Sequence, residues 1–233
     1  MRRRLIIALV LVWAGSSASH ATLIPTEQLE QFFIDHGVEY FTVADFQGNG
    51  GSGDYLFLPT RDPKDHETIG IFFELNTGNS LNDPAMHWAI GLRGPRPGAP
   101  LPDHYGGRGL ALGHLGAFDN CTDVGAFIED FTNAELGANH QLTLCQNLPL
   151  LTNYNTYRID IHVSKLNVYI QIWKKQYLPY VGWHYQKIGD YGCNQGFCPE
   201  NLIDKNFGGV FLGSASLGAG YTWTASDIHV AFF

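Results

Sequence analysis

The chain has 233 residues, of which 27 are glycine, 13% are aromatic and 15% are charged. Its formal charge is −8, and removal of Arg2, Arg3 and Arg4 with a signal peptide changes this from −8 to −11. An acidic protein repels phosphate backbones and anionic lipid headgroups, which argues against nucleic acid as a partner. Many glycines and aromatic residues with few charges are typical of an all-β protein with many turns.

The first 21 residues predict a cleavable secretory signal. Three arginines precede an apolar run from Leu5 to Ala14, and small residues lead to Ala21. This order is that of a signal peptide, and the run is too short to span a bilayer. We expect cleavage after Ala21 and a secreted or periplasmic protein. The start also loosely fits a twin-arginine signal, but the general secretion route agrees better with cysteines that form disulfides. No second long apolar run follows, so we expect no membrane insertion.

Residues 22–39 are predicted to form an N-terminal helical segment. Thr26 can cap a helix and Gly37 can end it. Between them, a three-and-four spacing that is typical of one helix face is found at Leu29, Phe32, Phe33 and His36. We expect this helix to lie against the rest of the protein.

Residues 40–233 predict a single β domain of short segments separated by glycine and proline. In residues 68–76 one face holds Ile69, Ile71, Phe73 and Leu75, with Phe72 and Glu74 on the other. Residues 86–94 and 109–118 also suggest strands, residues 124–136 fit a helix or a strand, and residues 174–206 are expected to be loop. Two closing strands follow, at 208–216 and 221–233.

Residues 157–173, "YRIDIHVSKLNVYIQIW", alternate strictly between apolar and polar side chains. This hairpin, followed by "GGVFLGSAS" and "SDIHVAFF", resembles the second half of concanavalin A-like lectin/glucanase jelly rolls. "ADF" and "IGIFFELN" resemble their opening strands. The resemblance implies a jelly-roll sandwich of two packed antiparallel sheets, one of them concave, to which the predicted N-terminal helix is added. It does not choose between lectin, glycosidase, lyase and adhesion module, because function on one fold depends on the side chains it carries.

A turn near Lys165 and Leu166 places three cross-strand pairs on one face of the hairpin. The pairs are Arg158–Trp173, Asp160–Gln171 and His162–Tyr169. Aromatic rings can stack on sugars, and the polar groups can hydrogen-bond to hydroxyls, so these six residues are the candidate carbohydrate-binding face. Arg158 over Trp173 is expected to form a cation–π contact. The alternative is an ordinary solvated sheet surface.

Two enzymatic alternatives use the same face to cleave an oligosaccharide or polysaccharide. A glycoside hydrolase needs two carboxylates, for which Glu74 and Asp160 are the candidates, but the "E-x-D-x-x-E" motif of the glucanase branch is absent. A lyase would use His162 and Tyr169 as base and acid, with Arg158 and Gln171 on a uronate. The expected lyase motifs are missing, and an acidic protein suits a polyuronate poorly. A further alternative is an adhesion module that binds protein.

The glycine-rich loop at 45–54 offers oxygen ligands at Asp45, Asn49 and Asp54 for a calcium ion, although a plain hairpin loop fits the same residues. The four cysteines are expected to form the disulfides Cys121–Cys145 and Cys193–Cys198. Neither pair has the C-x2-C spacing typical of zinc sites.

Overall fold

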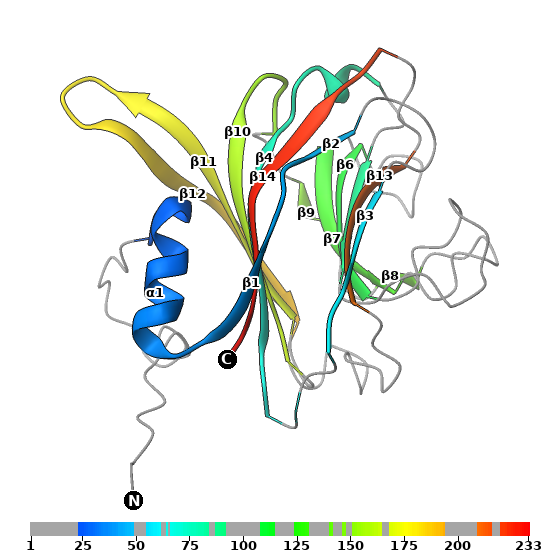
Figure 1. Ribbon diagram of the computed structural model, residues 1–233. Coiled ribbons are helices and arrows are strands. Elements are labelled where there is room, and N and C mark those ends of the chain that lie inside the picture. The colour runs from blue at the N-terminus through cyan, green and yellow to red at the C-terminus, as the bar shows by residue number, and fades with distance from the viewer. Residues whose placement is uncertain are drawn as a thin grey trace, which may run out of the picture.

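The protein folds into two antiparallel β-sheets that pack face to face (Figure 1), seen in a computed structural model. The structure describes residues 23–48, 55–61, 64, 66–83, 87–91, 108–114, 124–130, 140–141, 146–147, 151–164, 168–193, 209–215 and 220–233. In the described part of the chain, each sheet has seven strands. Among the described residues, no helix is both long enough and apolar enough to cross a bilayer.

The first sheet contains the strands nearest both ends of the chain. In spatial order these are β1 (Glu39–Val43), β14 (Trp223–Phe232), β4 (Ile69–Asn76), β10 (Thr156–Val163), β11 (Val168–Leu178) and β12 (Gly182–Cys193), with β2 (Phe46–Gly48) also paired to β14. The second sheet runs β3 (Tyr55–Pro59), β13 (Gly209–Ala215), β5 (His87–Gly91), β6 (Arg108–His114), β7 (Val124–Asp130) and β8 (His140–Gln141), with β9 (Gln146–Asn147) paired to β7.

The two packed antiparallel sheets and the short N-terminal helix confirm the all-β jelly-roll sandwich that the sequence predicts. Strands far apart in the sequence lie side by side, as β1 and β14 do, so each sheet is assembled by long crossovers. The ambiguous segment at 124–136 contains strand β7 rather than a helix. The segment expected to be a loop after residue 173 was predicted wrongly, because β11 continues to Leu178 and β12 follows it directly.

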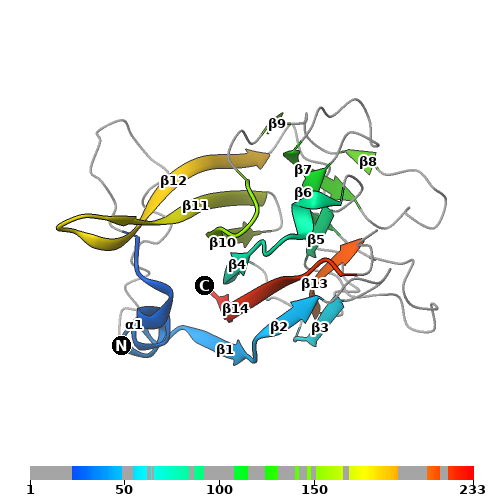
Figure 2. The ribbon, with the colours of Figure 1, turned by 90° about the horizontal axis from the view of Figure 1, so that it is seen from above.

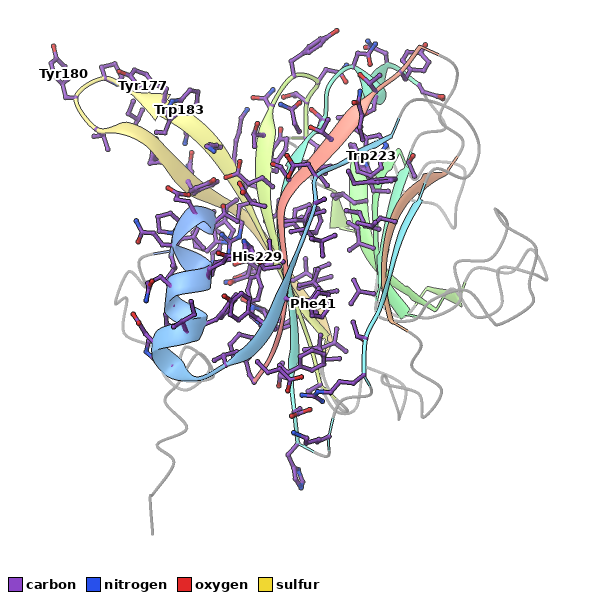
Figure 3. All side chains as sticks on the ribbon, in the orientation of Figure 1. Phe41, Tyr177, Tyr180, Trp183, Trp223 and His229 are labelled. Carbon is purple, nitrogen blue, oxygen red and sulfur yellow. The ribbon has the colours of Figure 1, made fainter. Side chains whose placement is uncertain are left out.

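The core lies between the sheets and consists of alternate residues of each strand. In the first sheet, the predicted apolar face of residues 157–173 is buried, at Ile159, Ile161, Val163, Ile170 and Ile172. Across the core, the Nε1 of Trp223 on β14 donates to the Oγ of Ser214 on β13 over 3.0 Å. Trp223 also meets Trp88 of β5 edge to face, with centroids 6.3 Å apart, and Figure 3 shows it between the sheets. These contacts join the two sheets at one end.

The predicted N-terminal helix packs on the outer face of the first sheet. A 3₁₀ turn, η2 (Thr26–Gln28), leads into α1 (Leu29–His36). Gly37 ends the helix in the left-handed region, with φ 64°, and donates to the Ile34 carbonyl. Leu29 and Phe33 are buried against Phe72 of β4 and Ala231 of β14. Because the helix covers this side, β4 is buried on both faces over most of its length.

The helix contact gives a direct test of the packing. Phe33 is fully buried, whereas its neighbour Ile34 is 59% exposed. We expect Phe33→Ala to lower the free energy of unfolding by about 3–5 kcal/mol through the lost apolar burial and the remaining cavity. The matched change Ile34→Ala should cost less than about 0.5 kcal/mol. Urea unfolding of both variants measures this, and equal losses would contradict the observed helix orientation.

Candidate functional site

The hairpin of β10 and β11 has the predicted register. Arg158 lies opposite Trp173, Asp160 opposite Gln171, and His162 opposite Tyr169. All six positions alternate with core residues, so they lie on the outer face of the first sheet. The sequence therefore predicts both the pairing and the face correctly. The β10 half of this face is covered by another segment of the chain, whereas the β11 half is accessible to solvent.

The half of the face on β10 is buried beneath the N-terminal segment. Arg158 is 1% exposed and Asp160 is 4% exposed. The Nε of Arg158 donates to Oδ1 of Asp160, and its Nη1 donates to the carbonyl of Ile24 over 3.3 Å. The guanidinium lies 5.5 Å from the ring centroid of Phe72. This corrects the expected partner, Trp173, and it removes Arg158 and Asp160 from the surface that a ligand can reach.

Glu74, the candidate hydrolytic carboxylate, is held by three other segments of the chain. It is 6% exposed and lies opposite Arg158 in the sheet register. Its carboxylate accepts hydrogen bonds from Thr26 Oγ1 at 3.0 Å, from Lys175 Nζ at 2.9 and 3.0 Å, and from Tyr185 OH.

The Thr26 hydroxyl therefore bonds to Glu74, and the helix cap predicted for it is not formed. With Asp160 bound by Arg158 and Glu74 bound by Lys175, both candidate carboxylates are engaged in internal ion pairs. This geometry disfavours the hydrolase hypothesis, because a nucleophile or general acid must reach the glycosidic bond.

Two histidines lie on the outer face of the first sheet among aromatic rings. His162 meets the Phe72 ring edge to face at 5.3 Å, and its ring is 6.4 Å from that of Phe233. His229 on β14 lies 6.3 Å from the Phe33 ring (Figure 3), and its Nδ1 is 3.1 Å from the hydroxyl of Thr42. Burial lowers the pKa of both histidines, against the opposite effect of nearby carboxylates. Both imidazoles are therefore neutral at pH 7.

The other half of the face, on β11 and β12, is open to solvent. We define the open face as Tyr169, Gln171, Trp173, Lys187 and Asp190, all half-buried or exposed. The pairing of β11 with β12 shifts by one residue after Ile172, and this places Asp190 opposite Gln171 and Lys187 opposite Trp173. Figure 2 shows that the β11–β12 hairpin extends to the same side of the first sheet as α1. The helix lies near β1, which is at the opposite end of the strand order from β12.

A network of hydrogen bonds fixes the polar groups of the open face. Tyr169 OH donates to Asp190 Oδ2 over 3.1 Å, and Lys187 Nζ donates to the same oxygen over 2.8 Å. Lys187 Nζ also lies 5.9 Å from the Trp173 ring centroid. Burial, together with the charge of Asp190, raises the pKa of Tyr169 to about 12. The hydrogen bond from Lys187 lowers the pKa of Asp190. At neutral pH the face thus presents a phenol, a carboxylate and an ammonium in fixed positions.

The sequence pattern does not indicate Lys187 and Asp190, because they belong to β12. That strand contains glycines at 182, 189 and 192, and the register shift interrupts its alternation. Neither feature predicts a long strand. In the sequence, the polar positions of the neighbouring β11 indicate that the polar face extends to a further strand.

The calcium and disulfide predictions fall largely outside the described residues. Asp45 is exposed between β1 and β2, but Asn49 and Asp54 are not described. Cys193 ends β12, and Cys121, Cys145 and Cys198 are not described. Within the described ranges, no three His, Cys, Asp or Glu side chains form a group that could hold a metal ion. The calcium site and both disulfides stay predictions.

No protein-family model matches the chain, and no curated protein matches it significantly. Among solved structures, the VIP36 exoplasmic/lumenal domain bound to Ca²⁺ and Man3GlcNAc is similar with a TM-score of 0.44 and 10% identity, over 84% of this chain and 83% of that one. Peanut lectin has a TM-score of 0.46 and 8% identity, over 84% and 90%. An endo-1,3-β-glucanase from Streptomyces sioyaensis has a TM-score of 0.45 and 10% identity, over 81% and 76%. At these values no activity transfers to this chain, and the fold rests on the strand order described above.

The buried histidines make stability depend on pH. A histidine whose pKa is lowered by folding binds fewer protons in the folded state than in the unfolded state. Its contribution is therefore complete above the unfolded pKa of about 6.5 and is lost as the pH falls below that value. We expect the free energy of unfolding to decrease between about pH 7.5 and pH 5, before most carboxylates titrate.

Urea unfolding at a series of pH values measures this slope. The double variant His162→Gln/His229→Gln should flatten this slope. An unchanged slope in the double variant would show that other groups control the pH dependence.

Glu74→Gln tests whether this carboxylate is structural. The substitution removes the charge that faces Lys175, whose side chain is 30% exposed. Breaking a buried ion pair costs several kcal/mol, and partial exposure of the lysine reduces this to about 1–3 kcal/mol. The exposed Glu27→Gln serves as control. A stable Glu74→Gln protein that had lost a glycosidase activity would instead restore the catalytic role.

Proposed function

We propose that the protein is a secreted carbohydrate-binding protein that holds an oligosaccharide or polysaccharide on the open face. One observation supports this most: the half-buried indole of Trp173 lies beside a Tyr169–Asp190–Lys187 hydrogen-bond network on rigid strands. Secretion rests on the predicted signal peptide at residues 1–21.

The chemistry of the open face suits a sugar. The Trp173 ring offers a flat apolar surface for the C–H face of a pyranose, and Lys187 and Asp190 provide charged donors and acceptors for hydroxyl groups. These groups bond to one another before any ligand arrives, so little side-chain entropy is lost on binding. Arg158 and Asp160 support the face from below, as a buried ion pair that fixes the β10 edge of the hairpin.

A polysaccharide lyase is the second candidate. His162 and Tyr169 face each other across β10 and β11, the lowered pKa of His162 leaves its imidazole free to accept a proton, and the Tyr169 phenol has a proton to donate. Digestion of a polyuronate would then increase ultraviolet absorbance as the unsaturated product forms, and His162→Ala would abolish the increase. A protein-binding adhesion module would give neither this signal nor glycan retention.

Retention on a glycan array tests carbohydrate binding. We expect Trp173→Ala and Tyr169→Ala each to reduce retention at least about tenfold, since each removes a contact worth about 1.4 kcal/mol or more. Both side chains are partly buried, so a melting curve of each variant must show that it is folded at the assay temperature. Trp183→Ala is the matched control, because this indole is 68% exposed and lies outside the open face. Unchanged retention in Trp173→Ala and Tyr169→Ala would exclude this face as the sugar site.

A further inference from the structure

The hairpin of β11 and β12 extends beyond the sheet and ends in exposed apolar side chains. β11 pairs with β10 only as far as Lys174, so the rest of the hairpin is two-stranded. We define the hairpin tip as residues 177–183. Its large apolar side chains are exposed by 61% at Tyr177, 43% at Leu178, 106% at Tyr180, 69% at Val181 and 68% at Trp183. Figure 3 shows Tyr177, Tyr180 and Trp183 at the far end of the hairpin, where it projects beyond the other strands.

The tip is an ordered turn. Tyr177 and Trp183 are cross-strand partners whose rings meet edge to face at 5.5 Å. The Val181 amide donates to the Leu178 carbonyl over 3.2 Å. Tyr180 has φ 73°, a left-handed conformation that is uncommon for a bulky side chain. The backbone thus presents the most exposed aromatic ring of the described residues at the very end of the hairpin.

Side chains along the hairpin axis follow a definite order. The aliphatic and aromatic residues of the turn come first, and the Tyr177–Trp183 pair stands one step behind them. Polar and basic side chains come next, at Gln176, His184, Lys174, Lys175 and Lys187. Residues 174–187 include three lysines and no Asp or Glu, in a chain whose formal charge is −8. Along the hairpin, apolar side chains are thus followed by an aromatic pair and then by basic side chains. The polarity of a bilayer changes in the same order from its interior to the surrounding water.

We propose that the hairpin tip inserts into the interface of a lipid bilayer, with the turn residues among the upper acyl chains and the lysines at the headgroups. Leu178 and Val181 offer a glycan neither a stacking surface nor hydrogen bonds, and their exposure favours acyl chains over a sugar as the partner of the turn. Tyr and Trp are enriched where one end of a side chain is apolar and the other is wet, as at a membrane interface. The hairpin tip shares no residue with the open face, although Lys187 of the open face also belongs to the basic part of the hairpin, and the inference does not depend on carbohydrate binding.

The net negative charge of the whole chain opposes binding to an anionic membrane. The hairpin tip, however, contains no acidic residue, and only charges close to the membrane surface affect its binding. Charges more than about 10 Å away are screened at physiological ionic strength, so the surface sees mainly the hairpin. Lys175 is paired with Glu74 and Lys187 with Asp190, which limits their attraction for anionic lipids. Apolar insertion should therefore provide most of the affinity, and anionic headgroups should add a smaller, salt-sensitive part.

Cosedimentation of the mature protein with vesicles tests this inference. The vesicles are phosphatidylcholine alone and phosphatidylcholine mixed with phosphatidylglycerol. We expect the protein to bind both kinds, with Leu178→Ser/Val181→Ser reducing the bound fraction at least about tenfold. Ile34→Gln, which changes an exposed apolar residue on α1, is the matched control and should bind as wild type does. Trp173→Ala should also bind vesicles normally, which separates this surface from the sugar site.

The outcomes are distinct. Quenching of Trp183 fluorescence by brominated lipid, absent in Trp183→Phe, would support insertion of the tip. The inference is overturned if wild type does not bind vesicles, or if the tip variant binds as well as wild type. It is also overturned if sedimentation shows a dimer that the tip variant converts to monomer without any vesicle binding, since the tip would then contact a second copy of the chain.

Discussion

The burial of Arg158 is the constraint on which the rest of this surface depends. A guanidinium that is 1% exposed needs both a countercharge and further acceptors, because an unpaired buried charge is very costly. Asp160 supplies the countercharge and the Ile24 carbonyl supplies an acceptor from the N-terminal segment. Residues 24–36 must therefore lie across the outer face of the first sheet, and the helix that follows brings Phe33 onto β4.

This cover divides one sheet face into two parts with different roles. Beneath it, Glu74 joins the N-terminal segment, β11 and β12 through Thr26, Lys175 and Tyr185. Removing any one partner leaves a buried polar group without its hydrogen bond, so the network favours a single arrangement of these segments. Beyond the cover, β11 and β12 remain solvated and their polar groups bond mainly to each other. The same ion-pair chemistry thus fixes the structure on one side and leaves a preformed polar surface on the other.

The sequence pattern predicts which neighbouring residues pair in a hairpin, but it does not predict which part of a sheet face is covered by another segment of the chain. Strict alternation over residues 157–173 predicts the register of Arg158 with Trp173, because a slip by one residue would place isoleucines in water. No local pattern indicates that Arg158 is buried, since that depends on Ile24, which lies 134 positions away. For the same reason Glu74 resembles a solvated strand residue in the sequence, and its lysine partner is 101 positions distant. Strand β12 was missed for a different reason, because its glycines and register shift remove the alternation that identifies strands.

The open face and the hairpin tip belong to the same two strands, which links the two proposed contacts. The open face includes residues near the centre of the sheet, such as Trp173, and the hairpin tip includes residues of the turn, such as Tyr180. The Lys175–Glu74 ion pair lies between these two surfaces. A hairpin fixed at that point transmits its orientation from one end to the other. A tip held at a lipid surface would therefore keep the open face at a constant distance and angle from that surface. Glycans attached to the same surface would then be met at high effective concentration, so weak individual contacts would suffice for stable attachment.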